Sequence, residues 1–498
     1  MAIPAEIRNV ERPKNTVIHA YGKNKDRYSV IERVGCKRKN GKPTPVDGKT
    51  VGHIIDGKFV PLKENKIETV SMSEVDIKRW ADIILCNSLT EEIQEELSKF
   101  YNPNDVNKIL CMAILRVCDP GIKDYELDDA FKSSFLSELY PDVHLGKNTV
   151  SKFQNDLGRT YSKIQEFMRL RTSTIQKNDC VLIDGTLKTN DSTENTFSEY
   201  SRKAKLKGRK DISIVYTFDL GKGEPICSQC FPGNMLDIRA YDRFVEDNKI
   251  ENGILIGDKV FSSNQIEAIL KEHPDLHYLS PLKRNSKLAK THEMYTGMRA
   301  LPGHNGILYK KEKVNGINKW LYSFRDLYLA CEEEKDWVLR AEKDDTYKAE
   351  DHEKKKEVFG TILLESDLDM EPKMAYEVRD WRWNIEVVMR DYKHSLEFDD
   401  TQVHDNESVI GCEFIDFIST IVTFKLLHTF NVKGLMEKKT YKEIMRILKH
   451  AQKIRTTNYS EWKLQRMNKN QLPILEGLGL IPKSDDPAPK KRGRPRKS

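Results

Sequence analysis

The N-terminal part of the chain alternates between apolar and polar positions in the manner of short β-strands. Residues 28–34 and 51–60 are rich in β-branched side chains, and glycines punctuate the sequence between and around them. A basic turn at residues 37–42, with the sequence KRKNGK, separates the two runs. This pattern predicts a small β-rich module over residues 1–65.

A helical period replaces the alternation from about residue 73 to residue 176. Ile93, Leu97 and Phe100 recur at a spacing of three or four, which places them on one face of a helix. Residues 145–152 then form a turn that leads into a helix with polar residues in its first turn. A helix-turn-helix presents its recognition helix to the major groove in this way, although a simple capped helix shows the same pattern. We expect a helical DNA-binding region here, with the capped helix as the alternative.

Apolar runs typical of strands dominate the segment that follows. They lie at residues 180–183, 212–218, 254–256 and 277–279. Three further strand-like pieces lie at residues 306–310, 319–324 and 327–331. Because strands here alternate with helical stretches, the pattern indicates an α/β layer structure.

The most apolar stretch of the chain, residues 414–432, carries Asp416, Lys425 and His428. A membrane-spanning helix needs about 20 predominantly apolar residues with few or no charges. The pattern therefore favours a helix packed inside a protein over a membrane span.

Composition narrows the class of protein. The 498 residues are 38% hydrophobic, which is enough apolar material for a core and excludes wholesale disorder. The nine cysteines are odd in number and scattered, which favours free thiols in a reducing compartment over a disulfide scaffold. Residues 1–15 mix Glu, Arg and Pro without an apolar run, so we expect no secretory signal and a cytoplasmic protein.

The net charge of +6 is concentrated near the C-terminus. Residues 483–498 hold seven Lys or Arg and two Asp, or +5, which leaves the rest of the chain nearly neutral. Within this tail Arg492 and Arg494 flank Gly493 as in an AT-hook, whose extended core fits the narrow A·T minor groove. A non-specific basic tail is the alternative. Either way, we expect the tail to be disordered in the free protein and to order on DNA.

Two of the apolar runs lead directly into an aspartate. Asp184 follows residues 181–183, and Asp258 follows residues 254–257. Ligands of open α/β sheets bind beyond the carboxyl ends of the strands, so an acid there faces a crevice. A turn or N-cap residue has the same local pattern, and that interpretation stays open for either aspartate alone.

A third acid is predicted on a helix over residues 376–393. At about 100° per residue, one narrow face collects a glutamate and four cations. These are Arg379, Arg382, Glu386, Arg390 and Lys393. A solvated face with i,i+4 ion pairs is the simple interpretation. Three acids with a basic stripe are, however, what metal-assisted phosphodiester chemistry needs, with carboxylates for Mg²⁺ and cations for DNA phosphates.

At these residues the chain resembles the DDE transposases of bacterial insertion sequences, over about residues 140–430. It is most similar to the branch with the signature Y-(2)-R-(3)-E-(6)-K, because Arg382, Glu386 and Lys393 match the last three letters. Asp184 in LIDGT matches the first acid of the family, and Asp258 in IGDKVFSSNQI matches the second.

Three details qualify or extend this resemblance. The segments FPGNMLD (231–237) and YLSPLKRN (278–285) are also similar to the family. The signature tyrosine would fall at Arg379, and the available Tyr376 lies one turn earlier. Arg379 is expected to supply a phosphate contact instead.

The resemblance implies an α/β fold with an RNase H-like catalytic core and a β-rich insertion. The insertion accounts for the 128 positions from Asp258 to Glu386. The implied division is a small β-rich module (1–65), the helical DNA-binding region (73–176), the first part of the core (177–285), the β-rich insertion (286–372), the core helices with the third acid (373–450), a C-terminal helical segment (451–482) and the basic tail (483–498).

The implied activity is cut-and-paste DNA transposition. Asp184, Asp258 and Glu386 would be catalytic and would bind Mg²⁺ or Mn²⁺, while the basic residues bind the transposon ends and the target DNA. The active complex is expected to be a homodimer associated with the bacterial nucleoid, with no membrane involved. A catalytically inactive or domesticated DNA-binding regulator is the alternative, and the intact acid trio argues against it.

A weaker signal is Cys227-x-x-Cys230, which has the spacing of half a zinc site. No second pair and no histidine follows at a suitable distance. Zinc binding at these cysteines is therefore disfavoured.

Overall fold

The computed structural model describes residues 3–22, 26–39, 42–62, 75–202, 204, 207–235, 237–257, 270–344, 346–379, 381–382, 401, 403–456, 459–468 and 471–483. The chain divides into two compact units, Met1–Val75 and Asp76–Ser498.

The N-terminal unit is a four-stranded antiparallel sheet in the order β1-β2-β3-β4 with one short helix. Its elements are α1 (Ala5–Arg8), β1 (Thr16–Tyr21), β2 (Arg27–Lys39), β3 (Lys42–Ile55) and β4 (Lys58–Pro61). Ile18, Val30 and Ile54 form its small core. The turn from β3 to β4 is an Asp-Gly pair, and both residues have positive φ (49° for Asp56 and 70° for Gly57), as tight hairpins require. The β-rich module predicted from the alternation is present.

The helical region predicted next is also present. It consists of α2 (Ala81–Ser88), α3 (Glu91–Leu97), α4 (Pro103–Cys118), the 3₁₀ turn η2 (Asp124–Glu126), α5 (Leu127–Lys132), α6 (Leu136–Leu139), α7 (Lys147–Arg159) and α8 (Tyr161–Thr172). Proline marks where α4 begins, because Pro103 occupies the first turn and the Asn102 side chain accepts a hydrogen bond from the Asp105 N–H.

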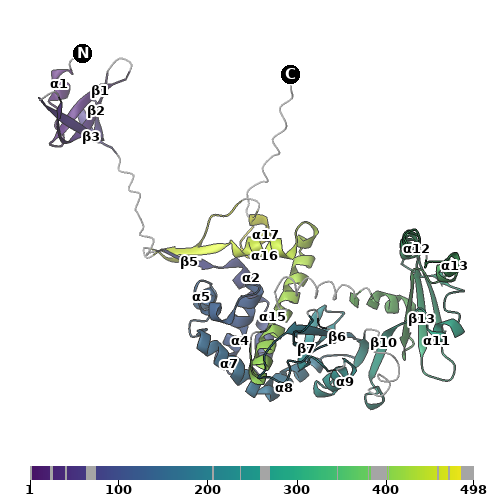
Figure 1. The fold of residues 1–498 in the computed structure, drawn as a ribbon. Helices are drawn as coiled ribbons and strands as arrows, with labels where there is room; N and C mark the ends of the chain where they lie inside the picture. The colour runs from purple at the N-terminus through teal and green to yellow at the C-terminus, as the bar shows by residue number, and fades with distance from the viewer. Residues whose placement is uncertain are drawn as a thin grey trace, which may run out of the picture. The chain divides into compact units, whose positions relative to one another are not determined.

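Five strands of the second unit form the core sheet (Figure 1). They are β6 (Cys180–Thr189), β7 (Asp211–Asp219), β8 (Glu224–Pro232), β9 (Gly253–Ile256) and β10 (Leu276–Leu282). Their spatial order is β8-β7-β6-β9-β10, with β7 antiparallel to both of its neighbours and β6, β9 and β10 mutually parallel. This order and these directions are those of an RNase H-like sheet, which confirms the expected fold of the core.

The insertion extends this same sheet. It contributes α11 (Lys287–Thr291), β11 (Arg299–Ala300), β12 (Ile307–Lys313), β13 (Trp320–Asp326), α12 (Leu327–Ala341), α13 (Ala349–Lys356) and β14 (Thr361–Ser366). β14 pairs antiparallel with β10, so the sheet reaches nine strands in the order β11-β12-β13-β14-β10-β9-β6-β7-β8.

One predicted strand of the insertion is wrong. Residues 327–331 begin α12, because the Asp326 carboxylate caps that helix by accepting hydrogen bonds from the N–H groups of Tyr328 and Leu329. A short apolar run does not distinguish a strand from a helix by its period alone. The cap decides between them.

Helices cover both faces of the core sheet. The Tyr241 hydroxyl of α9 (Asp237–Asp247) lies 3.3 Å from where a Cβ on Gly185 of β6 would sit. On the other face lies α15 (Asn406–Val432), whose Phe417 and Phe424 rings are 6.4 and 5.5 Å from rings of β7. α15 includes the helix predicted over residues 414–432, and it is buried almost all round, as its uniform apolarity requires. None of the helices in the described residues is both long and apolar enough to span a membrane.

Glycines allow α7 and α15 to cross in close contact. A Cβ on Gly158 would lie 1.9 Å from the Glu407 carbonyl oxygen, and one on Gly411 would lie 2.0 Å from the Gln154 carbonyl oxygen. Neither distance is sterically possible, so the crossing depends on both glycines. The helical region is thereby packed onto the central helix of the second unit.

The C-terminal part differs from the prediction. After α15 come η3 (Leu435–Glu437), α16 (Tyr441–Lys449), β15 (Gln452–Thr456), β16 (Tyr459–Leu464) and α17 (Leu472–Gly477). Residues 451–482 were expected to be helical, but β15 and β16 form a hairpin that adds to β5 (Val75–Arg79). The partner strand lies more than 370 positions away in the chain, and local periodicity does not reveal such pairing.

We expect Gly411→Ala to destabilise the second unit by about 1–3 kcal/mol or more, because overpacking forces the two helix backbones apart. Denaturant unfolding measures the change. Gly477→Ala is the control, since a Cβ there meets nothing within 4 Å. Equal stability of the two variants would contradict the close crossing.

Candidate active site

Asp184 lies on β6, the central strand of the core sheet, and is half-buried. The sequence predicted a strand that ends at this acid. The strand instead continues to Thr189, because β7 pairs with it from Asp184↔Tyr216 to Thr189↔Asp211. The parallel pairing with β9 has by then stopped at Leu182↔Ile256. Asp184 therefore stands two residues beyond the last parallel pair that the described residues form.

Strand alternation assigns the neighbours of Asp184 to two faces. Asp184, Thr186 and Lys188 share the face of β6 on which α15 packs, and Gly185 faces α9. The candidate acid therefore shares a sheet face with the central helix.

Only part of the predicted site lies within the described residues. Asp258, Glu386, Lys393, Arg492 and Arg494 lie outside them. Arg379 and Arg382 are described, are half-buried, and occur in helical segments at residues 372–379 and 381–382. The helix predicted from residue 376 thus begins one turn earlier, at residue 372.

Tyr376 is packed inside the protein. It is 5% exposed, and its ring centroid lies 5.1 Å from that of His304 and 5.2 Å from that of Phe324. Its ring is therefore part of the interface between this helix and the insertion.

The described residues form no group of three or more His, Cys, Asp or Glu side chains suited to a metal ion. Cys227 and Cys230 lie three positions apart on the regular part of β8, so their side chains point to opposite faces of the strand. This geometry explains why the two cysteines do not form half of a zinc site.

A buried charge network on the same face was missed by the sequence analysis. Lys188 Nζ lies 2.6 Å from Glu413 Oε2 and 2.8 Å from Asp416 Oδ2, both on α15. Arg116 of α4 lies 2.6 Å from the other Asp416 oxygen and 3.2 Å from Asp124 Oδ1. The network joins β6, α15 and the helical region. The sequence offered one signal of this network, which is Asp416 within an otherwise apolar helix, since a buried charge needs a partner.

Burial acts differently on the two carboxylates of α15. It raises the pKa of Glu413 to about 7, with Lys188 opposing the shift. Burial also tends to raise the pKa of Asp416, but Lys188 and Arg116 outweigh it and hold that pKa below its ordinary value. Asp416 is thus the member of the network that stays ionised, and Glu413 is the member that protonates near neutral pH.

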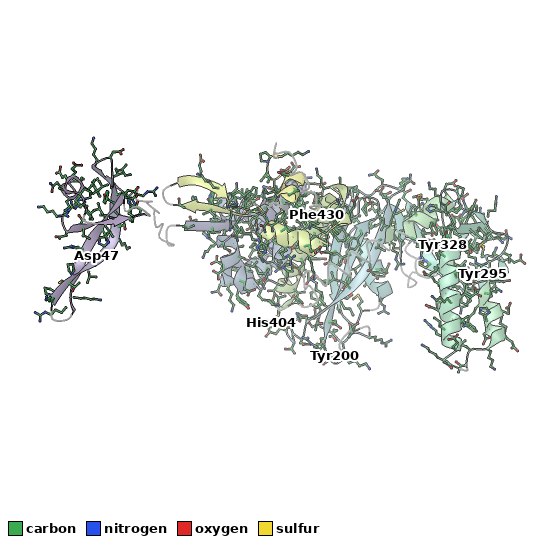
Figure 2. All side chains as sticks on the ribbon, turned by 90° about the horizontal axis from the view of Figure 1, so that it is seen from above. Asp47, Tyr200, Tyr295, Tyr328, His404 and Phe430 are labelled. Atoms are coloured by element: carbon green, nitrogen blue, oxygen red, sulfur yellow. The ribbon has the colours of Figure 1, made fainter. Side chains whose placement is uncertain are left out.

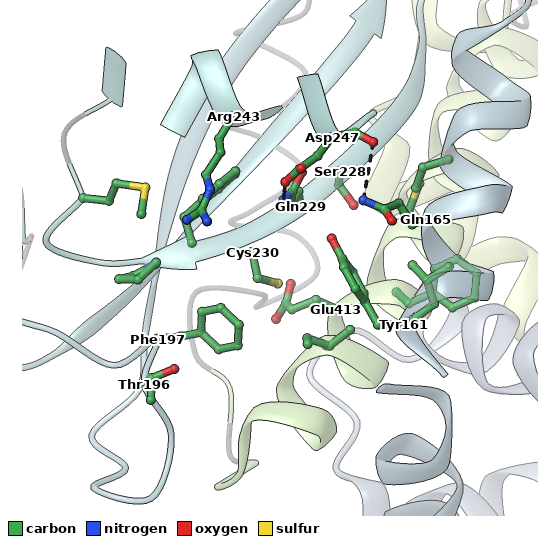
Figure 3. Close-up of a pocket in the computed structure, with 17 residues that line it drawn as sticks. Tyr161, Gln165, Thr196, Phe197, Ser228, Gln229, Cys230, Arg243, Asp247 and Glu413 are labelled. Atoms are coloured by element: carbon green, nitrogen blue, oxygen red, sulfur yellow. Dashed lines mark hydrogen bonds between the residues drawn. The ribbon is translucent and has the colours of Figure 1, made fainter. Parts of the chain in front are cut away.

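A cavity of about 420 Å³ opens beside this network (Figure 3). Glu413 and Cys230 lie next to each other in it, with Tyr161 of α8 close by and Arg243 of α9 farther along the wall. The second oxygen of Glu413, Oε1, has no hydrogen-bond partner among the described residues. Asp184 is not among the described residues that line this cavity.

Residues 175–410 match the family model of the transposase DDE domain. This segment of the chain is therefore similar to a transposase DDE domain. The matched segment runs from just before β6 to the first turn of α15 and includes the positions of all three predicted acids. None of the curated proteins matches the chain.

Solved transposase structures are similar to the chain at low identity. The piggyBac transposase synaptic complex with hairpin DNA is 13% identical, with a TM-score of 0.38 over 74% of this chain and 79% of that chain. The Mos1 transposase paired-end complex with the left transposon end and the Mos1 strand transfer complex are each 12% identical, with TM-scores of 0.15 over 32% of this chain and 58% and 57% of theirs. Scores this low do not establish a shared fold, and the RNase H-like assignment rests on the strand order.

We expect Lys188→Met to destabilise the fold by about 3–5 kcal/mol, because two buried carboxylates lose their shared cation. The loss of stability should be greater at pH 8 than at pH 6, because Glu413 is protonated at the lower pH and then no longer repels Asp416. Adding Glu413→Gln should recover part of the stability. Denaturant unfolding of the single and double variants at both pH values measures these effects, and a single variant as stable as the parent would rule out the network as a stabilising element.

Proposed function

We propose that the protein is a DNA transposase of the cut-and-paste type, which binds the terminal inverted repeats of an insertion sequence, cleaves the DNA and joins its 3′ ends to a target. The observation that carries the proposal is the transposase DDE domain over residues 175–410, on a sheet with RNase H-like strand order. Strand cleavage and strand joining are the chemistry of that domain family.

The strand register supports Asp184 and Asp258 as the first two catalytic acids. Leu182 and Ile256 are partners in adjacent parallel strands. Asp184 stands two positions after Leu182, and Asp258 stands two positions after Ile256. Both acids thus follow the same pair by the same number of residues, which favours a shared site on β6 beside the carboxyl end of β9.

The third acid of the proposed site is Glu386. Three carboxylates are the hard oxygen ligands that Mg²⁺ or Mn²⁺ prefers, and the half-buried Asp184 suits such a ligand. A bound cation would polarise the scissile phosphate and lower the pKa of the attacking water or 3′-hydroxyl. The protein's part is to fix the acids on rigid elements and to hold the DNA in line with them.

Basic residues on the helix of the third acid are the proposed DNA contacts near the cleaved end. Arg379, Arg382 and Lys393 lie on the predicted face of Glu386, and their role is to hold phosphates. Arg492 and Arg494 in the C-terminal tail add contacts with a bias toward A·T-rich DNA.

α7 is a candidate recognition helix in the helical region. Lys147, Asn148 and Lys152 in and after its first turn are exposed, while Val150 and Phe153 are buried. This division leaves one end of the helix available to a major groove, as in helix-turn-helix proteins. We further propose that the active complex is a homodimer and that the protein acts on DNA in the bacterial cytoplasm.

Asp184→Asn should abolish Mg²⁺-dependent nicking at the transposon ends and leave end binding nearly unchanged, because it removes a metal ligand without adding or removing bulk. Asp191→Asn is the control, since Asp191 is an exposed acid just after the same strand. Nicking and binding are measured on labelled end DNA. Full nicking by Asp184→Asn would refute the assignment of the acid.

Arg382→Ala and Lys393→Ala should each weaken strand joining. Each should also reduce the magnitude of the slope of log binding constant against log salt concentration by about 1 for each lost phosphate contact. Lys373→Ala is the control, because Lys373 is exposed in the helical segment 372–379 and lies 3.8 Å from Glu377. A salt slope and a joining rate equal to those of the control would show that this face is merely solvated.

A further inference from the structure

Strands β2 and β3 of the N-terminal unit continue as a pair beyond its four-stranded sheet. β1 pairs with β2 only as far as Glu32, and β4 pairs with β3 only from Gly52 onward. Past these points the described part of the unit shows β2 and β3 paired with each other, from Arg33↔Asp47 to Lys39↔Lys42 (Figure 2). We name this two-stranded ribbon, residues 33–39 and 42–49, the β-arm.

The β-arm is exposed on both of its faces. Residues 33–38 and 42–45 are all exposed, and Val34 reaches 61%. The small core of the unit lies elsewhere, at Ile18, Val30 and Ile54. A two-stranded ribbon in water is marginally stable by itself, so its length in this unit calls for a binding partner.

The β-arm is strongly basic. Residues 33–49 contain six Lys or Arg and one Asp, a net charge of +5 in a chain whose total is +6. The tail at 483–498 carries another +5, so the remainder of the chain is net acidic. The positive charge of the protein is thus confined largely to two segments, and the β-arm is the folded one among the described residues.

Strand alternation distributes these cations over both faces of the ribbon. Lys37 is paired with Thr44, and Lys42 is two positions from Thr44, so both lysines share one face. Arg38 is paired with Pro43 and lies on the other face. A ligand that places negative charge beside both faces of the ribbon therefore pairs with cations on both faces.

Two prolines exclude a further β-strand on the β3 side of the β-arm. Pro43 and Pro45 have no N–H, so that edge lacks donors at both positions for a strand from another protein. A two-stranded ribbon does fit the major groove of B-DNA, which is about 12 Å wide and is walled by phosphates on both sides. We propose that the β-arm enters the major groove of double-stranded DNA, with Lys37 and Lys42 on one wall and Arg38 on the other.

This inference rests on the proposed function and deepens it by adding a further DNA contact, remote in sequence from the DDE domain. Because phosphate contacts position DNA and carry little sequence information, the β-arm acts as a clamp rather than as a reader of the transposon end. Its failure and that of the transposase assignment are distinguishable, because nicking depends on Asp184 and clamping does not.

The test compares two triple variants of the full-length protein. Lys37→Ala, Arg38→Ala and Lys42→Ala together remove three cations from the β-arm. Lys14→Ala, Arg27→Ala and Lys58→Ala remove three exposed cations from the same unit outside it, with the same change of charge. Binding to a short mixed-sequence duplex is measured by fluorescence anisotropy over a range of salt concentrations.

The β-arm variant should bind at least about tenfold more weakly than the control, and the magnitude of its salt slope should fall by about 2 to 3. Its nicking rate at saturating end DNA should equal that of the parent. Equal affinities and slopes in the two variants would overturn the proposal. So would unchanged DNA binding together with a loss of binding to phosphatidylserine vesicles, which would identify a membrane surface as the partner.

A second measurement needs no variant. Cys36 is an exposed free thiol on the β-arm, and Cys331 is an exposed free thiol on α12 of the insertion. Duplex DNA should slow maleimide labelling of Cys36 in the parent protein at low salt, and the protection should disappear at high salt. Labelling of Cys36 at the same rate with and without bound DNA, normalised to Cys331, would also overturn the proposal.

Discussion

Lys188 brings one ammonium group from the central strand into contact with two carboxylates of the central helix, inside the protein. Taking such charges out of water costs several kcal/mol per ion, and close hydrogen-bonded partners must offset that cost. The partners lie on different elements: Lys188 on β6, Glu413 and Asp416 on α15, and Arg116 on α4. The charges are therefore satisfied only when sheet, central helix and helical region are assembled together. Asp184 shares a sheet face with this network, so the geometry of the candidate acid depends on the same assembly.

The second constraint is the close approach of α7 and α15. Gly158 and Gly411 remove the side chains that would hold the two backbones apart. The Asn155 amide of α7 adds a direct link, because it donates to Asp405, the residue that caps α15. The exposed first turn of α7 is consequently fixed with respect to the catalytic sheet. The proposed recognition helix and the proposed catalytic acid would gain from being held on one scaffold, since positioning supplies much of the rate of a phosphoryl transfer.

The insertion has a structural role in the core sheet. β14 hydrogen-bonds to β10, so the insertion continues the core sheet rather than forming a separate lobe. The helical segment that leads toward Glu386 leaves the insertion shortly after β14, and Tyr376 anchors its beginning against Phe324 and His304. The described beginning of this helical segment is thus held against the insertion.

The sequence by itself determined those elements in which the buried residues recur at the period of a strand or of a helix. The core strands and the apolar helix over 414–432 follow from hydrophobic patterning, because a residue buried in either element must recur at its period. The motifs around Asp184, Asp258 and Glu386 likewise predict a DDE-type site, and the structure describes the first of these acids. Only the tertiary structure decided that the strand continues past Asp184, because β7 supplies partners as far as Thr189.

Tertiary structure also decided the features that depend on residues far apart in the chain. Lys188 and Asp416 are 228 positions apart, and the strands at 452–464 pair with β5 from the other end of the unit. In each case the deciding interaction is a hydrogen bond or an ion pair whose partner is selected by the path of the folded chain. Local propensity carries no information about such a partner, and that is the physical reason why the sequence left these features open.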